Sequence, residues 1–230
     1  MSKRFSKKNF KAKLFKAKLF KAVLFDMDGV VVDSMPYHFI SWFEALKRYG
    51  VRVSPITIFE MEGAKWSAVI ELAFKQSGKK LITGLADKIR FEREEIFKKY
   101  FKRHIFNGIP EFVKFLKRQS LLTGLVTGSS LKEAERFLPK NLYALFDVIV
   151  AGDIVQRSKP YPDPYLIAAK KLGVLPKDCL VIENAPYGIK SAKAAKMFCV
   201  AVATTLPKSN LSQAGRVFDT HKELYEIFKK

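Results

Sequence analysis

Five short, mostly apolar runs along the chain are typical of buried strands, and they lie at 22–28, 122–127, 146–152, 179–184 and 198–203. Segments with a helical spacing of apolar residues lie between them, at 109–119, 130–138, 163–172 and 186–196. Nearly continuous apolar strands that alternate with helices predict an α/β fold with a doubly wound parallel sheet covered on both faces. At one boundary, Asp163 is expected to cap a helix that begins at Pro164.

Residues 35–104 interrupt this alternation, because they contain no clear strand and are patterned as several helices. Two of these helices are expected within 37–50 and 86–104. The simplest organisation is a helical block inserted after the first strand. We therefore expect three parts, namely a basic extension at 1–19, an α/β core formed by 20–33 and 106–230, and an inserted helical cap domain at 34–105.

The composition is that of a globular protein, since 48% of the 230 residues are hydrophobic and 28% are charged. No apolar run is long enough for a transmembrane helix, and the beginning of the chain lacks the uninterrupted apolar segment of a secretion signal. Cys179 and Cys199 lie in strand-like runs, and we interpret them as buried thiols rather than as a disulfide. These features favour a cytoplasmic protein.

The net charge of +20 changes this picture of an ordinary globular protein, because it favours anionic partners. Nine positive charges precede Asp26, the first acidic residue, in a segment where the phrase FKAKL-FKAKL-FKAVL spans 10–24. A period of five fits neither the face of a helix nor the face of a strand. We interpret the last copy as a strand and the earlier copies as a non-catalytic extension, which either contacts polyanions or pairs at a sheet edge.

Polar residues follow the predicted strands in four places, namely Asp26-Met27-Asp28-Gly29, Thr127-Gly128-Ser129-Ser130, Lys159-Pro160 and Glu183-Asn184. Each of these patterns alone is common in solvated loops. However, ligands of open parallel sheets bind beyond the carboxyl ends of the strands. The four positions together would gather two carboxylates, a hydroxyl, an ammonium and further oxygen ligands around one point.

This set of groups suits phosphoryl transfer to a carboxylate. Attack of Asp26 on phosphorus would form an aspartyl-phosphate and divide one difficult displacement into two easier ones. Asp28 is placed to protonate the leaving oxygen and then to deprotonate water. The Thr127 hydroxyl and the Lys159 ammonium would hold the phosphoryl oxygens. Because negatively charged oxygens must approach each other, a hard cation is required, and we expect Mg²⁺.

The segments VLFDMDGVVVDS, LVTGSS, SKPYPDPYL and VIENAPYGIKSAKAAKMF resemble, in this order, the four motifs of the haloacid dehalogenase-like (HAD) superfamily. The chain is most similar to the β-phosphoglucomutase-like group with a helical cap, over nearly everything from Lys21 onward. The resemblance implies a Rossmann-like core, a Mg²⁺ cofactor, Asp26 as nucleophile and Asp28 as acid/base. It also implies substrate-binding and metal-binding residues, which are Thr127, Gly128, Ser129 and Lys159 for the phosphate and Asp26, Asp28, Glu183 and Asn184 for the metal.

The fourth motif departs from this family pattern. Asn184 stands where many relatives have an Asp that ligates Mg²⁺, so one negative charge is missing and weaker metal binding is expected. Glu62 lies at the cap position that faces the core in similar enzymes, and it is a candidate to complete the metal shell when the cap closes. The alternative is that Glu62 is an exposed helix-end residue. This combination resembles the inorganic-pyrophosphatase-like members of the group.

The residues after the cap glycine help to distinguish a hydrolase from a mutase in this group. Members similar to β-phosphoglucomutase usually have an Arg shortly after the cap glycine, whereas Gly63 is followed here by Ala64 and Lys65. Lys65 would bind a distal phosphate only as a point charge, and His38 either contacts substrate or packs. We expect a Mg²⁺-dependent phosphohydrolase, monomeric, acting on a small phosphorylated metabolite or pyrophosphate. A sugar-phosphate mutase is the alternative.

A catalytically inactive, basic nucleic-acid-binding protein is the alternative from a different functional class. The net charge favours it, but the sequence contains no aromatic-rich RNA-binding motif, zinc-ligand spacing or recognition-helix pattern. The joint presence of Asp26, Asp28, Thr127 and Lys159 favours the enzyme.

Overall fold

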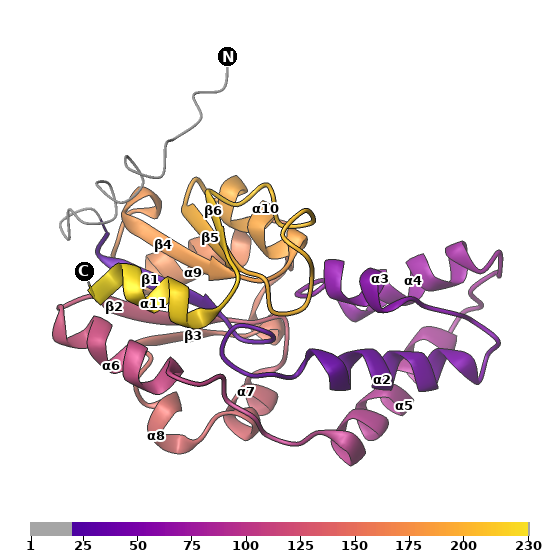
Figure 1. The fold of residues 1–230 in the computed structure, drawn as a ribbon. Coiled ribbons are helices and arrows are strands. Elements are labelled where there is room, and N and C mark those ends of the chain that lie inside the picture. The colour runs from indigo at the N-terminus through magenta and orange to yellow at the C-terminus, as the bar shows by residue number, and fades with distance from the viewer. Residues whose placement is uncertain (1–19, 230) are drawn as a thin grey trace.

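The computed structural model describes residues 20–229, and Figure 1 shows an α/β core beside a group of helices. Within the described residues, the core contains one parallel sheet in the order β3-β2-β1-β4-β5-β6. The strands are β1 (Ala22–Asp26), β2 (Leu122–Val126), β3 (Val148–Val150), β4 (Cys179–Glu183), β5 (Phe198–Val202) and β6 (Arg216–Phe218). This order reverses direction at β1 and is that of a doubly wound Rossmann-like sheet, which confirms the predicted fold class.

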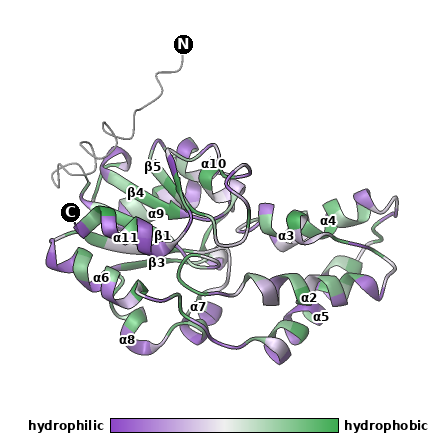
Figure 2. Cartoon of the chain, viewed as in Figure 1, coloured by the Kyte–Doolittle hydropathy of each residue, from purple (hydrophilic) through white to green (hydrophobic). Residues whose placement is uncertain are grey.

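Helices cover both faces of the sheet, as its apolar strands require. Val23 and Phe25 of β1 pack on one face with α6 (Ile109–Arg118) and α11 (His221–Lys229). The alternate residues of β1 pack on the other face with α9 (Asp163–Lys171) and α10 (Pro186–Ala194). Figure 2 shows these strands as hydrophobic ribbons between helices of mixed hydropathy. Shorter helical elements complete the core, namely α7 (Leu131–Phe137), α8 (Lys140–Tyr143), η1 (Gly152–Ile154) and η2 (Pro176–Asp178).

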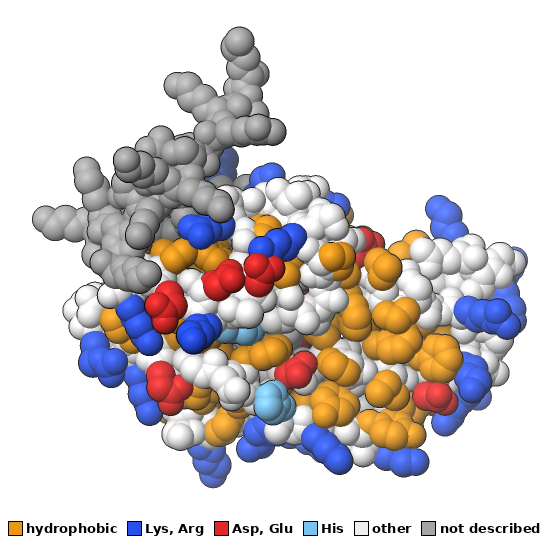
Figure 3. All heavy atoms as spheres, viewed as in Figure 1, with side chains coloured by type: hydrophobic (Ala, Val, Ile, Leu, Met, Phe, Trp, Pro, Cys, Tyr) orange, Lys and Arg blue, Asp and Glu red, His pale blue; other side chains and the backbone are white. Residues whose placement is uncertain are grey.

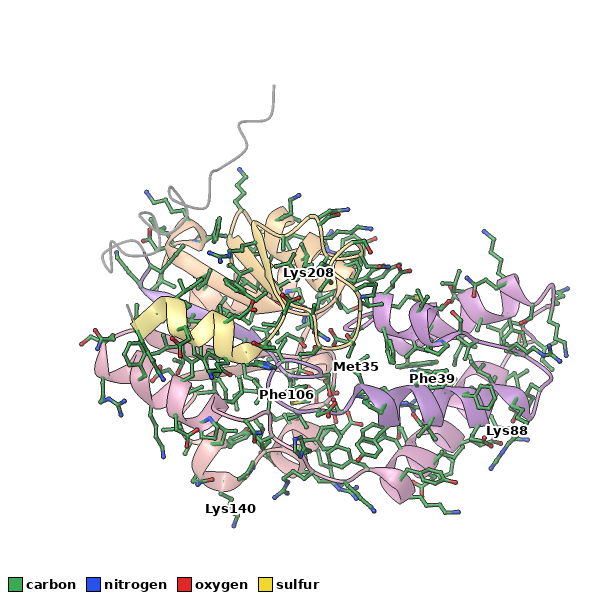
Figure 4. The ribbon with its side chains drawn as sticks, in the orientation of Figure 1. Met35, Phe39, Lys88, Phe106, Lys140 and Lys208 are labelled. Atoms are coloured by element: carbon green, nitrogen blue, oxygen red, sulfur yellow. The ribbon has the colours of Figure 1, made fainter. Side chains whose placement is uncertain are left out.

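The helical insertion between β1 and α6 has a hydrophobic core of its own. It consists of α2 (Met35–Lys47), α3 (Pro55–Glu60), α4 (Trp66–Gln76) and α5 (Leu85–Tyr100). Trp42, Leu46, Ile70, Phe74 and Ile89 are buried between these helices. Met35 lies where the chain leaves the core, and Lys88 lies far from that junction, as Figure 4 shows. We call these four helices and their loops the cap; its expected boundaries at 34 and 105 stay a prediction.

Two details differ from the prediction. β6 was not among the predicted strands, because a three-residue edge strand with a charged first residue is too short to form an apolar pattern. The prediction that Asp163 caps α9 was wrong, since Asp163 is the first residue of the helix and Pro162 precedes it. The Asp163 carboxylate instead accepts two hydrogen bonds from Arg157, each 3.0 Å long, and this pairing competes with capping.

The structure also bears on the general expectations. Cys179 and Cys199 are buried free thiols, as predicted. No helix among the described residues is long and apolar enough to cross a membrane. Lys and Arg side chains are spread over the visible face of both the core and the cap in Figure 3. The basic extension at 1–19 lies outside the described residues, but the last repeat copy leads into β1 as expected, and Phe20 stacks on Phe198.

Candidate active site

The carboxyl ends of β2, β1 and β4 lie side by side, and predicted functional residues occur at each of them. Asp26, the last residue of β1, is in register with Val126, so Thr127 follows immediately on the neighbouring strand. Glu183 ends β4, which pairs with the other edge of β1. Parallel pairing therefore brings the first, second and fourth sequence motifs to one edge of the sheet.

The Lys159 ammonium lies between two of these carboxylates. Its Nζ atom donates to Oδ1 of Asp26, to Oε1 of Glu183 at 2.8 Å, and to the Val126 carbonyl at 3.3 Å. The Tyr165 hydroxyl donates to the same Glu183 oxygen at 2.6 Å, and the Lys159 ammonium lies 5.3 Å from the Tyr165 ring centroid. Glu183 thus anchors Lys159. Tyr165 was not among the predicted site residues, because an aromatic residue at this place in a helix is typical of ordinary core packing.

Glu62 of the cap lies beside the same carboxylates. Asp26, Glu62 and Glu183 each have an oxygen within 4.8 Å of the others, and we call these three residues the carboxylate cluster. Glu62 is only 8% exposed, so the alternative of an exposed helix-end residue is wrong. The sequence alone left this choice open, since the outcome depends on how the cap docks on the core.

The carboxylate cluster carries more negative charge than Lys159 can balance. Burial raises the pKa of Asp26 well above its ordinary value, against the attraction of Lys159 and with the repulsion of Glu183. Burial and then the charge of Asp26 raise the pKa of Glu62 in the same way. Burial works against the Lys159 cation, but the surrounding carboxylates outweigh it and raise the pKa of Lys159. Three carboxylates facing one ammonium would be balanced by a divalent cation.

Glycines allow the cap to approach this closely. Gly63 has a φ of +79°, and a Cβ atom there would lie 2.4 Å from Cδ of Lys159. A Cβ atom on Gly128 would lie 2.9 Å from the Gly63 Cα atom. Gly128, predicted to bind substrate, is therefore a contact point between core and cap. A side chain at either position would force the cap, and Glu62 with it, to shift relative to Asp26 and Glu183.

Asp28 is enclosed by four side-chain groups. Its Oδ1 atom accepts from Ser34 at 2.6 Å and contacts His38 Nε2 at 3.0 Å. Its Oδ2 atom accepts from Thr127 at 3.1 Å and from Ser129 at 3.3 Å. Burial opposes ionisation of Asp28, yet attraction to His38 and these hydrogen bonds outweigh it and lower the pKa to about 2. The hydroxyls predicted to hold phosphate thus face the predicted acid/base.

His38 is held in turn by Arg93 of α5, which the sequence analysis missed. An Arg93 Nη2 atom contacts Nδ1 of His38, and the guanidinium lies 5.3 Å from the Trp42 ring centroid and 5.0 Å from that of Phe97. Arg93 therefore contacts the ring nitrogen of His38 that does not face Asp28. Arg93 stands among acidic residues in FEREE, so the sequence suggests a solvated helix face.

The residues of the site fit a hard cation. Three buried side-chain oxygens at this site have no hydrogen-bond partner among the described residues, namely Asp26 Oδ2, Glu62 Oε2 and Asn184 Oδ1. Carboxylate and amide oxygens are ligands that Mg²⁺ accepts. By contrast, both oxygens of Glu183 already accept hydrogen bonds, from Lys159 and Tyr165 on one side and from backbone N–H groups on the other. Buried acceptors without donors are expected where an ion binds.

One predicted site residue, Lys65, has an exposed side chain in the cap. It is exposed at the N-terminal boundary of α4. No hydrogen bond or ion pair joins it to the cluster within the described residues. Its proposed contact with substrate stays a prediction.

Known proteins resemble this chain in sequence and in fold. A model of the haloacid dehalogenase-like hydrolase family matches residues 20–196. The chain is 31% identical over 182 residues to the fructose-1-phosphate phosphatase YqaB of Escherichia coli, covering 77% of this chain and 93% of that protein. It is 29% identical over 180 residues to a phosphorylated carbohydrates phosphatase of Thermotoga maritima, covering 74% and 79%. A Bacteroides vulgatus structure, provisionally named a beta-phosphoglucomutase, superposes with a TM-score of 0.86 at 32% identity, covering 97% of both chains.

Proposed function

The chain belongs to the haloacid dehalogenase-like hydrolases, as a phosphatase-type member, and on this premise we propose that it is a Mg²⁺-dependent phosphohydrolase that forms an aspartyl-phosphate on Asp26. The observation that carries the proposal is the carboxylate cluster around Lys159 at the carboxyl ends of β1 and β4. A basic nucleic-acid-binding protein without catalysis would have no use for three buried carboxylates and an ammonium in contact.

Asp26, Glu62 and Asn184 would hold the metal, because their buried oxygens lack other partners. By resemblance to the family, the Asp28 backbone carbonyl would join them. The bound cation would supply the positive charge that lets a phosphate approach the Asp26 carboxylate. Lys159 would offset the charge on the transferring oxygens while Glu183 and Tyr165 keep its ammonium in place.

The reaction would proceed in two displacements. In the first, a carboxylate oxygen of Asp26 attacks phosphorus, the bond to the leaving oxygen breaks, and Asp28 gives that oxygen a proton. In the second, a water oxygen attacks phosphorus, Asp28 takes its proton, and the bond between Asp26 and phosphorus breaks. With the four contacts around it, Asp28 is ionised and ready to act as the base; to act as an acid, it must be protonated and give up part of this shell.

We infer that the substrate is a small phosphorylated metabolite, and sugar phosphates are the first class to test, because the named relatives act on fructose 1-phosphate and phosphorylated carbohydrates. Hydrolysis is favoured over mutase activity because Gly63 is followed by Ala64, Lys65 and Trp66 rather than closely by an Arg, and because the Lys65 side chain is exposed. Pyrophosphate is a second candidate. The placement of Glu62 beside Asp26 favours it, since a small substrate would leave room for a cap carboxylate next to the metal.

A substrate panel tests the proposal. Sugar phosphates, pyrophosphate and an aryl phosphate are assayed for Mg²⁺-dependent phosphate release with the unmutated protein and with Asp26→Asn. We expect turnover of at least one physiological substrate and none with D26N. If the unmutated protein releases phosphate from no compound, or D26N is equally active, the proposal fails. Glu62→Ala should reduce pyrophosphate turnover far more than aryl phosphate turnover; equal losses would eliminate the role of Glu62.

A further inference from the structure

The connection between β5 and β6, at 203–215, touches three functional parts of the molecule. The Thr204 hydroxyl donates to the Gly29 carbonyl at 2.7 Å, directly after Asp28. Asn184 Nδ2 donates to the Thr205 hydroxyl at 3.2 Å. Asn210 Nδ2 donates to Glu60 of the cap at 2.8 Å. Lys208, which is labelled in Figure 4, lies in this connection. None of its side chains takes part in the two displacements.

Asn184 raises a problem that an Asp in its place would not. A carboxylate offers two equivalent oxygens, whereas an amide has one oxygen that accepts and one NH₂ group that donates. Asn184 is fully buried next to Glu183, at the edge of the sheet that carries the carboxylate cluster. An unrestrained amide there would turn its NH₂ group toward the negative charges, and its oxygen would face away from the metal.

Two contacts keep the NH₂ group of Asn184 from turning toward the carboxylates. The Thr205 hydroxyl accepts its hydrogen bond. The same nitrogen lies close against Gly29, since a Cβ atom on Gly29 would lie 2.1 Å from Nδ2. The Asn184 oxygen is left buried and without a partner. One end of the amide is therefore fixed by protein groups and the other is free for a ligand.

We propose that Thr205 is a positioning residue that orients the Asn184 amide so that its oxygen, rather than its nitrogen, is presented to the metal. The inference rests on the proposed Mg²⁺ site. In this role Thr205 would act through its contact with Asn184 and not by touching substrate or metal itself. Outer residues of this kind fix the orientation of metal ligands in many proteins, and their loss commonly weakens metal binding by about 10- to 100-fold.

The test compares Mg²⁺ affinity, measured by calorimetry on the full chain without substrate, in two backgrounds. Thr205→Val removes the hydroxyl at nearly constant volume, and Thr205→Ala is a second variant in case valine does not fold. We expect T205V to bind Mg²⁺ about tenfold more weakly than the unmutated protein. Thr205→Ser keeps the hydroxyl, so its Mg²⁺ affinity should stay close to that of the unmutated protein. Ser209→Ala is the matched control, because it removes an exposed hydroxyl from the same connection.

The first background is the unmutated protein, and the second is Asn184→Asp. The Asp carboxylate has two equivalent oxygens, so the metal-binding side chain at position 184 no longer needs to be oriented. There T205V should weaken Mg²⁺ binding by less than about threefold, so the two substitutions should be non-additive. Unchanged affinity in T205V, or an equal loss of affinity in both backgrounds, would overturn the role of Thr205. Absence of Mg²⁺ binding by the unmutated protein would instead contradict the proposed Mg²⁺-dependent function on which this inference rests.

Discussion

Gly63 of the cap packs directly on the aliphatic part of Lys159 in the core. A Cβ atom on Gly63 would lie 2.4 Å from Cδ of Lys159. The same lysine holds Asp26 and Glu183 through its ammonium. One side chain therefore contacts the cap through its methylene groups and the proposed nucleophile through its charge, so the position of the cap and the geometry of the site are linked.

Gly63→Ala should lower kcat/KM by at least about tenfold, because a shift of about 1 Å at a catalytic group can reduce the rate by a factor of about 100. Gly78→Ala is the matched control, since Gly78 also has a positive φ, of +64°, but has no neighbour within 4 Å of an added Cβ atom. Both variants should lose about 1–2 kcal/mol of stability from backbone strain. Equal kcat/KM in the two would show that the Gly63 contact does not set the site geometry.

Asp26→Asn should abolish turnover yet stabilise the metal-free protein. The pKa of Asp26 is raised in the folded state, so its ionisation removes stability as the pH rises through that pKa. Each pKa unit of this shift corresponds to about 1.4 kcal/mol. In EDTA, the melting temperature of D26N should exceed that of the unmutated protein at pH 8, and the difference should shrink toward pH 4. Asp87→Asn, at a side chain 73% exposed, should show no such gain.

His221 should make the protein less stable in mild acid. Burial lowers the pKa of His221, against the hydrogen bond of its Nε2 atom with the Val30 carbonyl and the attraction of Asp33. The unfolded chain then binds a proton near pH 6.5 that the folded chain does not bind, so stability falls as the pH decreases below that value. The drop in melting temperature from pH 7.5 to 5.5 should be smaller in His221→Gln. Replacement of the exposed His104 by Gln should leave the drop unchanged.

Deletion of residues 2–18 should leave kcat/KM unchanged, because the catalytic groups come from residues beyond it. The deletion removes eight basic residues and no acidic one. It should therefore lower the salt concentration at which the protein elutes from heparin, a model polyanion. A large loss of turnover would contradict the interpretation of this segment as a non-catalytic extension, and unchanged elution would contradict its contact with polyanions.

The α/β core and the meeting of the main motifs are predictable from the sequence. The apolar runs before Asp26, Thr127 and Glu183 predict buried parallel strands, and such strands end at a common edge whatever the details of packing. The approximate position of the site follows from this topology. The family resemblance added the roles expected of each motif.

The contacts between elements that are distant in the chain are visible only in the folded structure. His38 and Arg93 are 55 residues apart, and Asn184 and Thr205 are 21 residues apart. Whether Glu62 reaches Asp26 depends on the docking of the cap, which in turn depends on the absence of a side chain at Gly63. Periodicity and spacing report the neighbours of a residue within its own helix or strand. Which side chains meet across two packed elements is set by the relative position of those elements, and local sequence does not encode it.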